Sequence, residues 1–110
     1  MKTFNKYKFI ENLKEEISNE LSYNYSKGMD ISEDMIREQI YSSIENQCIY
    51  SYDAWAIVYE LGENDFANPI TGGTCKNIYE LAYYSLLEYT ENEIDVYDII
   101  ETFENENEKN

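Results

Sequence analysis

The residues of this chain that could do chemistry are carboxylates and thiols, because the sequence contains no histidine. Histidine catalysis, histidine metal ligation and histidine pH switching are therefore excluded. Paired carboxylates work as acid and base where an apolar pocket raises the pKa of one of them, and no motif nominates such a pocket. Gly72 and Gly73 precede a predicted helix, but the strand, third glycine and lysine of a phosphate-binding loop are missing. We expect a protein that is not an enzyme.

The two cysteines, Cys48 and Cys75, do not form a metal-binding pattern. Structural zinc sites use paired cysteines and histidines at short spacing, and neither cysteine has such a neighbour. The alternating acids and central glycine of an EF-hand are also missing. We expect no metal and no cofactor. The chain opens with no signal segment, so we expect a cytoplasmic protein with reduced thiols; a disulfide between the two is the alternative.

Carboxylates are the strongest feature of the sequence. The chain has 8 lysines and arginines against 23 acids, a net charge of −15. Residues 1–28 carry five lysines and four glutamates, whereas residues 29–110 carry three cations against 19 acids. A field of this sign repels nucleic acid and anionic membrane and attracts a basic groove of another protein. The plain alternative is that the acidity only provides solubility.

The acids form two strips at helical spacing. In the last segment they step three residues apart, which places neighbours roughly 5–6 Å from one another; this ladder is Asp95, Asp98, Glu101 and Glu104. The second strip is Glu33, Asp34 and Glu38. A solvated helix face is the simpler interpretation of either strip alone. The prediction of a partner rests on both strips together and on the scarcity of cations after residue 28.

Tyrosine is the other excess, with 12 in the chain. Tyrosine is enriched where proteins bind one another, because it buries a large area at modest cost in entropy. Helical spacing places several of these tyrosines outside the predicted core faces of their helices: Tyr41, Tyr50, Tyr59, Tyr83 and Tyr84. We predict Tyr83 and Tyr84 as anchors for a partner. The alternative, which we expect for most of the twelve, is that tyrosine fills the core with its hydroxyl at the rim.

Hydrophobic periodicity predicts an all-α fold, a compact bundle of about five helices. The predicted helices cover about residues 4–25, a segment capped by Asp30 or Ser32, a segment from a cap at Ser51 to Gly62, Thr74 to about Tyr89, and a segment that begins near Thr90 or Asp95. We expect a single helical domain over residues 1–104 and a polar C-terminal tail over residues 105–110. The alternating run over residues 48–52 is too short and isolated to build a sheet.

Two of the predicted helices have faces that bear on function. In the third helix we place four residues inward: Ala54, Trp55, Val58 and Leu61. The fourth helix is apolar on both sides, with Ile78, Leu81, Ala82, Ser85, Leu86 and Tyr89 on one and Tyr83, Tyr84 and Leu87 on the other. A helix of this kind lies at the centre of a bundle or packs on a partner.

Two stretches of the chain share a pattern, residues 40–53 and residues 83–98. Each has a long helix, a tight connector that ends in Tyr-Asp and a short helix. Two helical hairpins with the first helix laid across them would explain it. Chance similarity is the alternative, because tyrosine, isoleucine, serine and glutamate are abundant.

Three short motifs carry a resemblance to a known group of proteins. Ile36-Arg-Glu-Gln-Ile40, Ile49-Tyr-Ser-Tyr-Asp53 and Asn77-Ile-Tyr-Glu-Leu81 resemble segments of small acidic proteins encoded by bacteriophages. The resemblance covers about residues 31–90 and supplies no catalytic residues. It implies a phage or mobile-element origin, a location in the host bacterial cell, and a role among inhibitors of host defence such as anti-CRISPR and anti-restriction proteins. The lysines of residues 1–28 depart from the more uniformly acidic DNA mimics.

These observations predict an anti-CRISPR-like inhibitor of a bacterial defence nuclease. Its acidic helix faces would bind the basic nucleic-acid groove of a partner such as a CRISPR effector, without direct contact to nucleic acid or membrane. One alternative is an assembly module that forms a homodimer, or docks on another protein, through the second side of the fourth helix. Another is a small-molecule sequestering protein with an aromatic pocket around Trp55.

Overall fold

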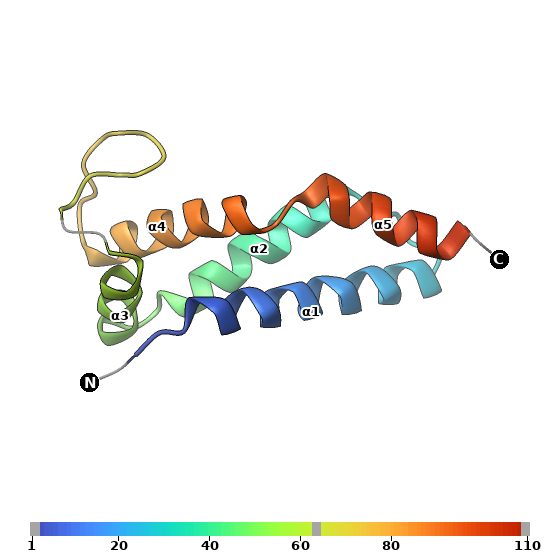
Figure 1. The fold of residues 1–110 in the computed structure, drawn as a ribbon, viewed down its shortest axis with the longest axis horizontal. Helices are drawn as coiled ribbons and strands as arrows, with labels where there is room; N and C mark the ends of the chain where they lie inside the picture. The colour runs from blue at the N-terminus through green and yellow to red at the C-terminus, as the bar shows by residue number, and fades with distance from the viewer. Residues whose placement is uncertain (1–2, 63–64, 109–110) are drawn as a thin grey trace.

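The computed structural model describes residues 3–62 and 65–108, and those residues form five helices and no strand. The helices are α1 (Lys6–Ser26), α2 (Glu33–Gln47), α3 (Ser51–Leu61), α4 (Ile78–Glu93) and α5 (Val96–Glu108). Figure 1 shows α1, α2 and the α4–α5 pair running along the long axis, with α3 across one end. The body measures 51 × 29 × 19 Å. The predicted all-α class is confirmed.

Side-chain caps explain where most of the helices begin. Four of them start after a residue whose side-chain oxygen accepts a hydrogen bond from the backbone N–H three residues on: Asn5, Ser32, Asn77 and Asp95. Such a bond satisfies an amide that the helix itself leaves without an acceptor. At the other end of α3, Gly62 takes a left-handed conformation with φ of 77°, which glycine adopts without the strain of a Cβ.

Three helix boundaries differ from the prediction. Ser51 is the first residue of α3 and not its cap; Tyr50 occupies the cap position without a side-chain hydrogen bond. α4 begins at Ile78 and not at Thr74, because Asn77 caps it while residues 66–75 close a loop through an isolated bridge between Ala67 and Thr74. α5 continues past Glu104 to Glu108, so residues 105–108 belong to the helix; residues 109–110 lie outside the described part.

One hydrophobic core runs through the body. Its fully enclosed large side chains come from α1 to α4: Leu13, Ile17, Leu21, Ile36, Ile44, Ile57, Leu81 and Leu86. α4 packs closely on α3 and also contacts α2. Leu87, on the second side of α4, is only 8% exposed. The apolar character of both sides of α4 therefore reflects a central position in the bundle.

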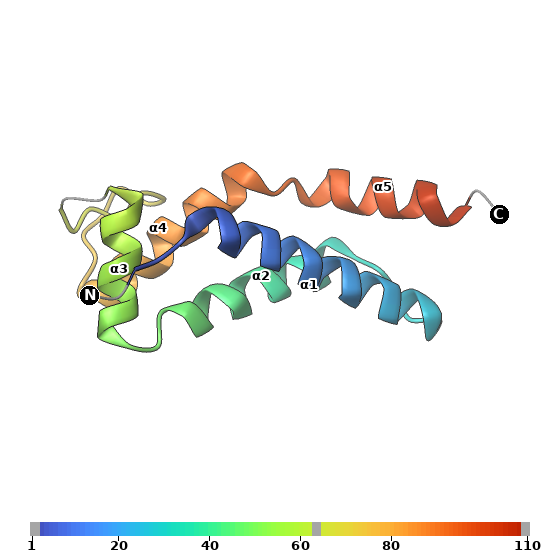
Figure 2. The same cartoon turned by 60° about the horizontal axis from the view of Figure 1, so that its bottom comes forward.

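Neither pair of helices in the predicted repeat closes into a hairpin. α3 turns steeply away from α2, and α5 continues in nearly the direction of α4 after a short break at Ile94 and Asp95 (Figure 2). The helices that pack side by side come from different pairs, α3 with α4 and α2 with α5. α1 lies along the body beside α2. Among the described residues, no helix is both long and apolar enough to span a membrane.

Candidate functional site

The predicted ladder begins at the residue that caps α5 and continues along that helix. Asp95, Asp98, Glu101 and Glu104 are all exposed, and no cation within the described part of the chain forms an ion pair with them. Asp95 has a structural task as well, because its Oδ1 accepts the backbone N–H of Asp98 at 3.1 Å and caps the helix. Asp98 lies in the first turn, where a negative charge is favourable to the helix dipole. The remaining carboxylates have no such local explanation.

The ladder is a spiral and not a straight stripe. A step of three residues falls about 60° short of a full helical turn, so four residues sweep roughly half of the helix surface. Asp95 and Asp98 consequently line a groove between α5 and α1, whereas Glu101 and Glu104 lie outside it. The structure thus divides the predicted ladder into two pairs with different surroundings.

The groove between α1 and α5, which we call the acidic groove, has a volume of about 430 Å³. Its apolar lining residues are Ile17, Leu21, Ile94, Ile99 and Phe103. Its acids are Glu93, Asp95, Asp98 and Glu106, and its cation is Lys14 of α1. The ring of Phe103 meets Tyr25 of α1 edge to face at 5.7 Å and closes α5 onto α1. Sequence reasoning missed Glu93 and Glu106, because their relation to α1 depends on how distant helices pack.

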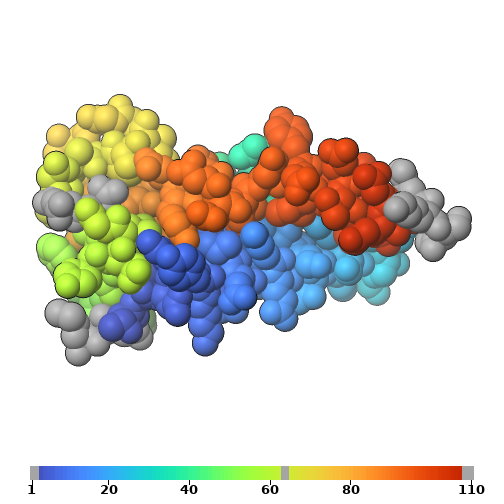
Figure 3. All heavy atoms as spheres, viewed as in Figure 1, coloured from blue at the N-terminus to red at the C-terminus, as the bar shows by residue number. Residues whose placement is uncertain are grey.

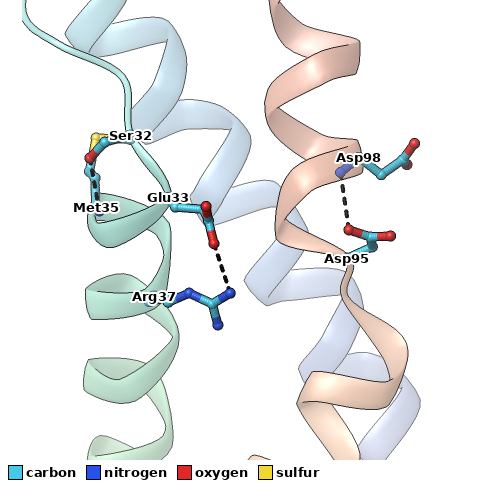
Figure 4. A network of polar contacts seen from close by, with 6 residues as sticks. All are labelled: Ser32, Glu33, Met35, Arg37, Asp95 and Asp98. Atoms are coloured by element: carbon cyan, nitrogen blue, oxygen red, sulfur yellow. Dashed lines mark hydrogen bonds and ion pairs between the residues drawn. The ribbon is translucent and has the colours of Figure 1, made fainter.

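The second predicted strip lies on α2, and its members differ in their surroundings. Glu33 forms an ion pair with Arg37 at 2.9 Å, and both point from α2 toward the start of α5 (Figure 4). Asp34 and Glu38 are exposed. α2 and α5 pack on each other, but Asp95 and Asp98 point away from Glu33 and Arg37 (Figure 4), so the packing does not bring the two strips onto one face. Arg37 offsets one charge of the α2 strip, and Asp34 and Glu38 remain as the solvent-facing part of the strip.

The predicted tyrosine anchors are half-buried within the chain. The rings of Tyr83 and Tyr84 meet edge to face at 5.3 Å, and both side chains pack against the core. Burial, with a smaller contribution from the charge of Glu45 on α2, raises the pKa of Tyr83 above its ordinary value. Part of the Tyr83 side chain is therefore buried between α4 and α2, and less of its area is exposed for contact with a partner.

The aromatic surface lies on α3 instead, and the placement of Trp55 in the core was wrong. Trp55 is 56% exposed, and Tyr59 is 83% exposed. The core stripe of α3 is Ala54, Ile57, Val58 and Leu61. Trp55 lies one residue after Ala54 and so falls outside this stripe. It shares a second stripe with Tyr52 and Tyr59, at spacing i, i+3 and i+7. That spacing was the signal in the sequence that could have identified this face.

The two cysteine thiols lie in the core of the described residues and not at a surface. Cys48 and Cys75 are buried and form no disulfide with each other. Burial, with the charge of Asp53, raises the pKa of Cys48 to about 12, so its thiol is neutral and a poor nucleophile at pH 7. Within residues 3–62 and 65–108, no three cysteines or acids gather to hold a metal ion.

Comparison of the chain with protein-family models, with curated proteins and with solved structures finds no match.

Proposed function

We propose that this protein is a non-enzymatic inhibitor that occupies the basic, nucleic-acid-binding groove of a partner protein through the acidic surface of α5 and α2. The observation that carries the proposal is the exposed ladder on α5, beside the acidic groove, with no cation of the described chain paired to it. Like charges three residues apart destabilise a helix. Basic side chains of a partner would remove that repulsion, so binding would stabilise α5.

The linear charge density of the body supports nucleic-acid mimicry. A net charge of −15 along a long axis of 51 Å corresponds to about one negative charge per 3.4 Å. One strand of nucleic acid carries a charge at about the same interval, roughly 3.4 Å. The charge of the protein is spread over all faces of the body, so the comparison concerns the overall negative field that a basic groove would meet and not the charges of one surface. Bacterial defence nucleases, which the resemblance to phage proteins implied as targets, have grooves of this kind.

The acidic groove adds a second kind of contact to this charge. Among its apolar lining residues, Ile99 and Phe103 are partly exposed, and four acids line the same groove. Lysine and arginine carry an apolar stem and a charged end. A partner's basic side chain can lay its stem on Ile99 and Phe103 and place its charge beside Asp98 or Glu106. The proposal therefore assigns binding to Asp95, Asp98, Glu93 and Glu106, with Glu101, Glu104 and the α2 strip as the surrounding field.

Competition for a purified target tests the proposal. Labelled DNA or RNA is bound to each member of a panel of CRISPR effectors and restriction enzymes, and its displacement by the protein is measured across a salt series. We expect displacement from at least one enzyme, with affinity that falls steeply as salt rises. The double variant Asp98→Lys/Glu101→Lys should weaken displacement more than tenfold.

A matched control changes the same charge elsewhere. Glu11 and Glu15 are exposed on α1 and do not line the acidic groove. The double variant Glu11→Lys/Glu15→Lys makes the same change in net charge, and it should displace nucleic acid nearly as well as the original protein. Circular dichroism of both variants checks that the helices are retained. Displacement that responds neither to salt nor to the change at Asp98 and Glu101 contradicts the proposal.

A further inference from the structure

We propose that the aromatic face of α3 is a binding site for an arginine side chain presented by a peptide segment of a partner. The site is a groove of about 590 Å³ lined by Tyr52, Trp55, Ala56, Tyr59 and Glu60 of α3 and by Thr3 and Phe4, which precede α1. We call it the α3 groove. It lies at the opposite end of the body from α5 (Figure 3). The inference does not depend on the function proposed for the acidic surface.

Folding does not account for the exposure of these rings. Ala54, Ile57 and Val58 already fix α3 on the core, and Trp55 and Tyr59 project from the other side of the helix. Burying an aromatic side chain is worth several times the burial of a methylene group. A cluster of rings left in water at one place is therefore typical of a surface that another molecule covers.

The chemistry of the groove favours a cation. The faces of tryptophan and tyrosine rings carry negative potential and attract cations, and the carboxylate of Glu60 lies on the same lining. Ring faces elsewhere in this protein already hold cations: Lys6 Nζ is 5.4 Å from the ring centroid of Tyr7, and Lys27 Nζ is 5.8 Å from that of Tyr23. The net charge of −15 attracts a basic ligand and opposes a second copy of the chain.

Arginine fits this lining better than lysine does. Its guanidinium is planar, stacks on aromatic faces and is weakly hydrated, and it forms paired hydrogen bonds to a carboxylate. The groove offers two exposed rings, Trp55 and Tyr59, beside the carboxylate of Glu60. Its volume exceeds that of one side chain and lies within the range of ordinary ligand sites. We therefore infer that the flanking backbone of the peptide also lies in the groove.

The test uses the one tryptophan of the chain as its reporter, because Trp55 lines the groove. A blocked seven-residue peptide with one central arginine among glycines and prolines is titrated into the protein, and Trp55 fluorescence is recorded. The comparison peptide has citrulline, which keeps the shape of arginine and removes its charge. We expect saturable binding of the arginine peptide and about tenfold weaker binding of the citrulline peptide.

Three variants keep Trp55 and separate the possible causes. Tyr59→Ala should lose most of the binding, and because Tyr59 is 83% exposed the fold should be retained. Tyr97→Ala removes a ring that is 68% exposed on α5, outside the groove, and should bind normally. Asp98→Lys/Glu101→Lys should also bind nearly normally, so loss of the acidic surface and loss of the α3 groove give different results.

Several outcomes overturn the proposal. Equal binding of the arginine and citrulline peptides means that the groove takes an uncharged segment. Binding that is lost in the α5 variant and kept in Tyr59→Ala means that the peptide responds to net charge alone. Absence of binding by both peptides excludes the arginine site. A Trp55 signal that changes with protein concentration, together with a doubled mass in light scattering, means that a second copy covers the face.

Discussion

The α3 end and the α5 end of this molecule present two different surfaces on helices that are held in different ways. α3 is fixed by a complete core stripe against α4, and its outer side carries exposed rings. α5 packs on α2 and meets α1 through Phe103 and Tyr25, and its outer side carries carboxylates. Its inward residues after Val96, which are Ile99, Ile100 and Phe103, are only partly buried.

The difference indicates how each end would bind. Charge acts over several ångströms and is screened by salt, so the α5 surface would mainly speed association and set a salt-dependent affinity. Aromatic rings act by contact and desolvation, so the α3 groove would mainly slow dissociation and resist salt. The firmer packing of α3 also suits a groove whose shape must be kept. The looser α5 can gain stability when a partner neutralises it.

Truncating a core side chain at each end should give the largest difference between the α3 end and the α5 end, measured as the loss of unfolding free energy. Ile57 of α3 is fully buried, whereas Ile99 of α5 is partly exposed. Isoleucine to alanine in a closed core costs about 2–5 kcal/mol because it removes apolar contacts and leaves a cavity. We expect Ile57→Ala to lie in the upper half of that range and Ile99→Ala to cost about 1–2 kcal/mol. Urea unfolding followed by circular dichroism measures both.

Equal losses in the two variants would show that α5 is held as firmly as α3. The slope of the urea transition serves as the control. A slope that is unchanged in both variants means that the difference lies in stability and not in the compactness of the unfolded chain.

A smaller effect is expected where α4 passes into α5. Thr90 is fully buried, and its Oγ1 has no hydrogen-bond partner among the described residues. A buried polar atom without a partner costs free energy, and an apolar group of the same shape avoids that cost. Thr90→Val should therefore raise the free energy of unfolding by about 1 kcal/mol. It should also slow the local opening of α5, so that the stability of the α5 end comes closer to that of the α3 end.

Ser85 of α4 is the companion test, since its buried Oγ also has no partner in the described part of the chain. Ser85→Ala removes the oxygen without filling its volume, so we expect a smaller gain than for Thr90→Val. A loss of stability in Thr90→Val would mean that the hydroxyl is bonded to an ordered water, and hydrogen exchange around Ile94 would then become faster.

The sequence predicted the helices well because periodicity of apolar residues is a local property. Ile36, Ile40 and Ile44 recur at helical spacing and are all buried in α2. The end of α3 at Gly62 was also predicted correctly, because the left-handed conformation that commonly ends a helix is favoured by glycine. Boundaries near competing caps were less certain, as Asn77 shows for α4.

Other features depended on how distant helices pack and could not be predicted from spacing. A spacing of three places Asp98 and Glu101 on one ladder, but only the position of α1 shows that Asp98 lines the acidic groove and Glu101 does not. The α1 side of the lining includes Lys14 and Ile17, which are far from α5 in the sequence. Trp55 was misplaced for a different reason: α3 carries an aromatic stripe beside its core stripe, and the prediction assigned Trp55 to the core stripe.

The smallest effect concerns repulsion within the ladder, and it distinguishes the two ends by their response to salt. Glu101 lies three residues from both Asp98 and Glu104, so Glu101→Gln should stabilise α5 by about 0.2–0.5 kcal/mol at low salt. The gain should fade near 0.5 M sodium chloride, where screening shortens the range of charge interactions to a few ångströms.

Hydrogen exchange of α5 amides reports this local stability. The amides of α3 serve as the internal reference, because its core face is apolar and its exchange should respond little to salt. If hydrogen exchange in α3 and in α5 changed equally with salt, the negative charge would act on the stability of the whole protein and not on α5 alone. The carboxylates of α5 would then be a general feature of an acidic protein and not a locally strained surface that a basic partner relieves.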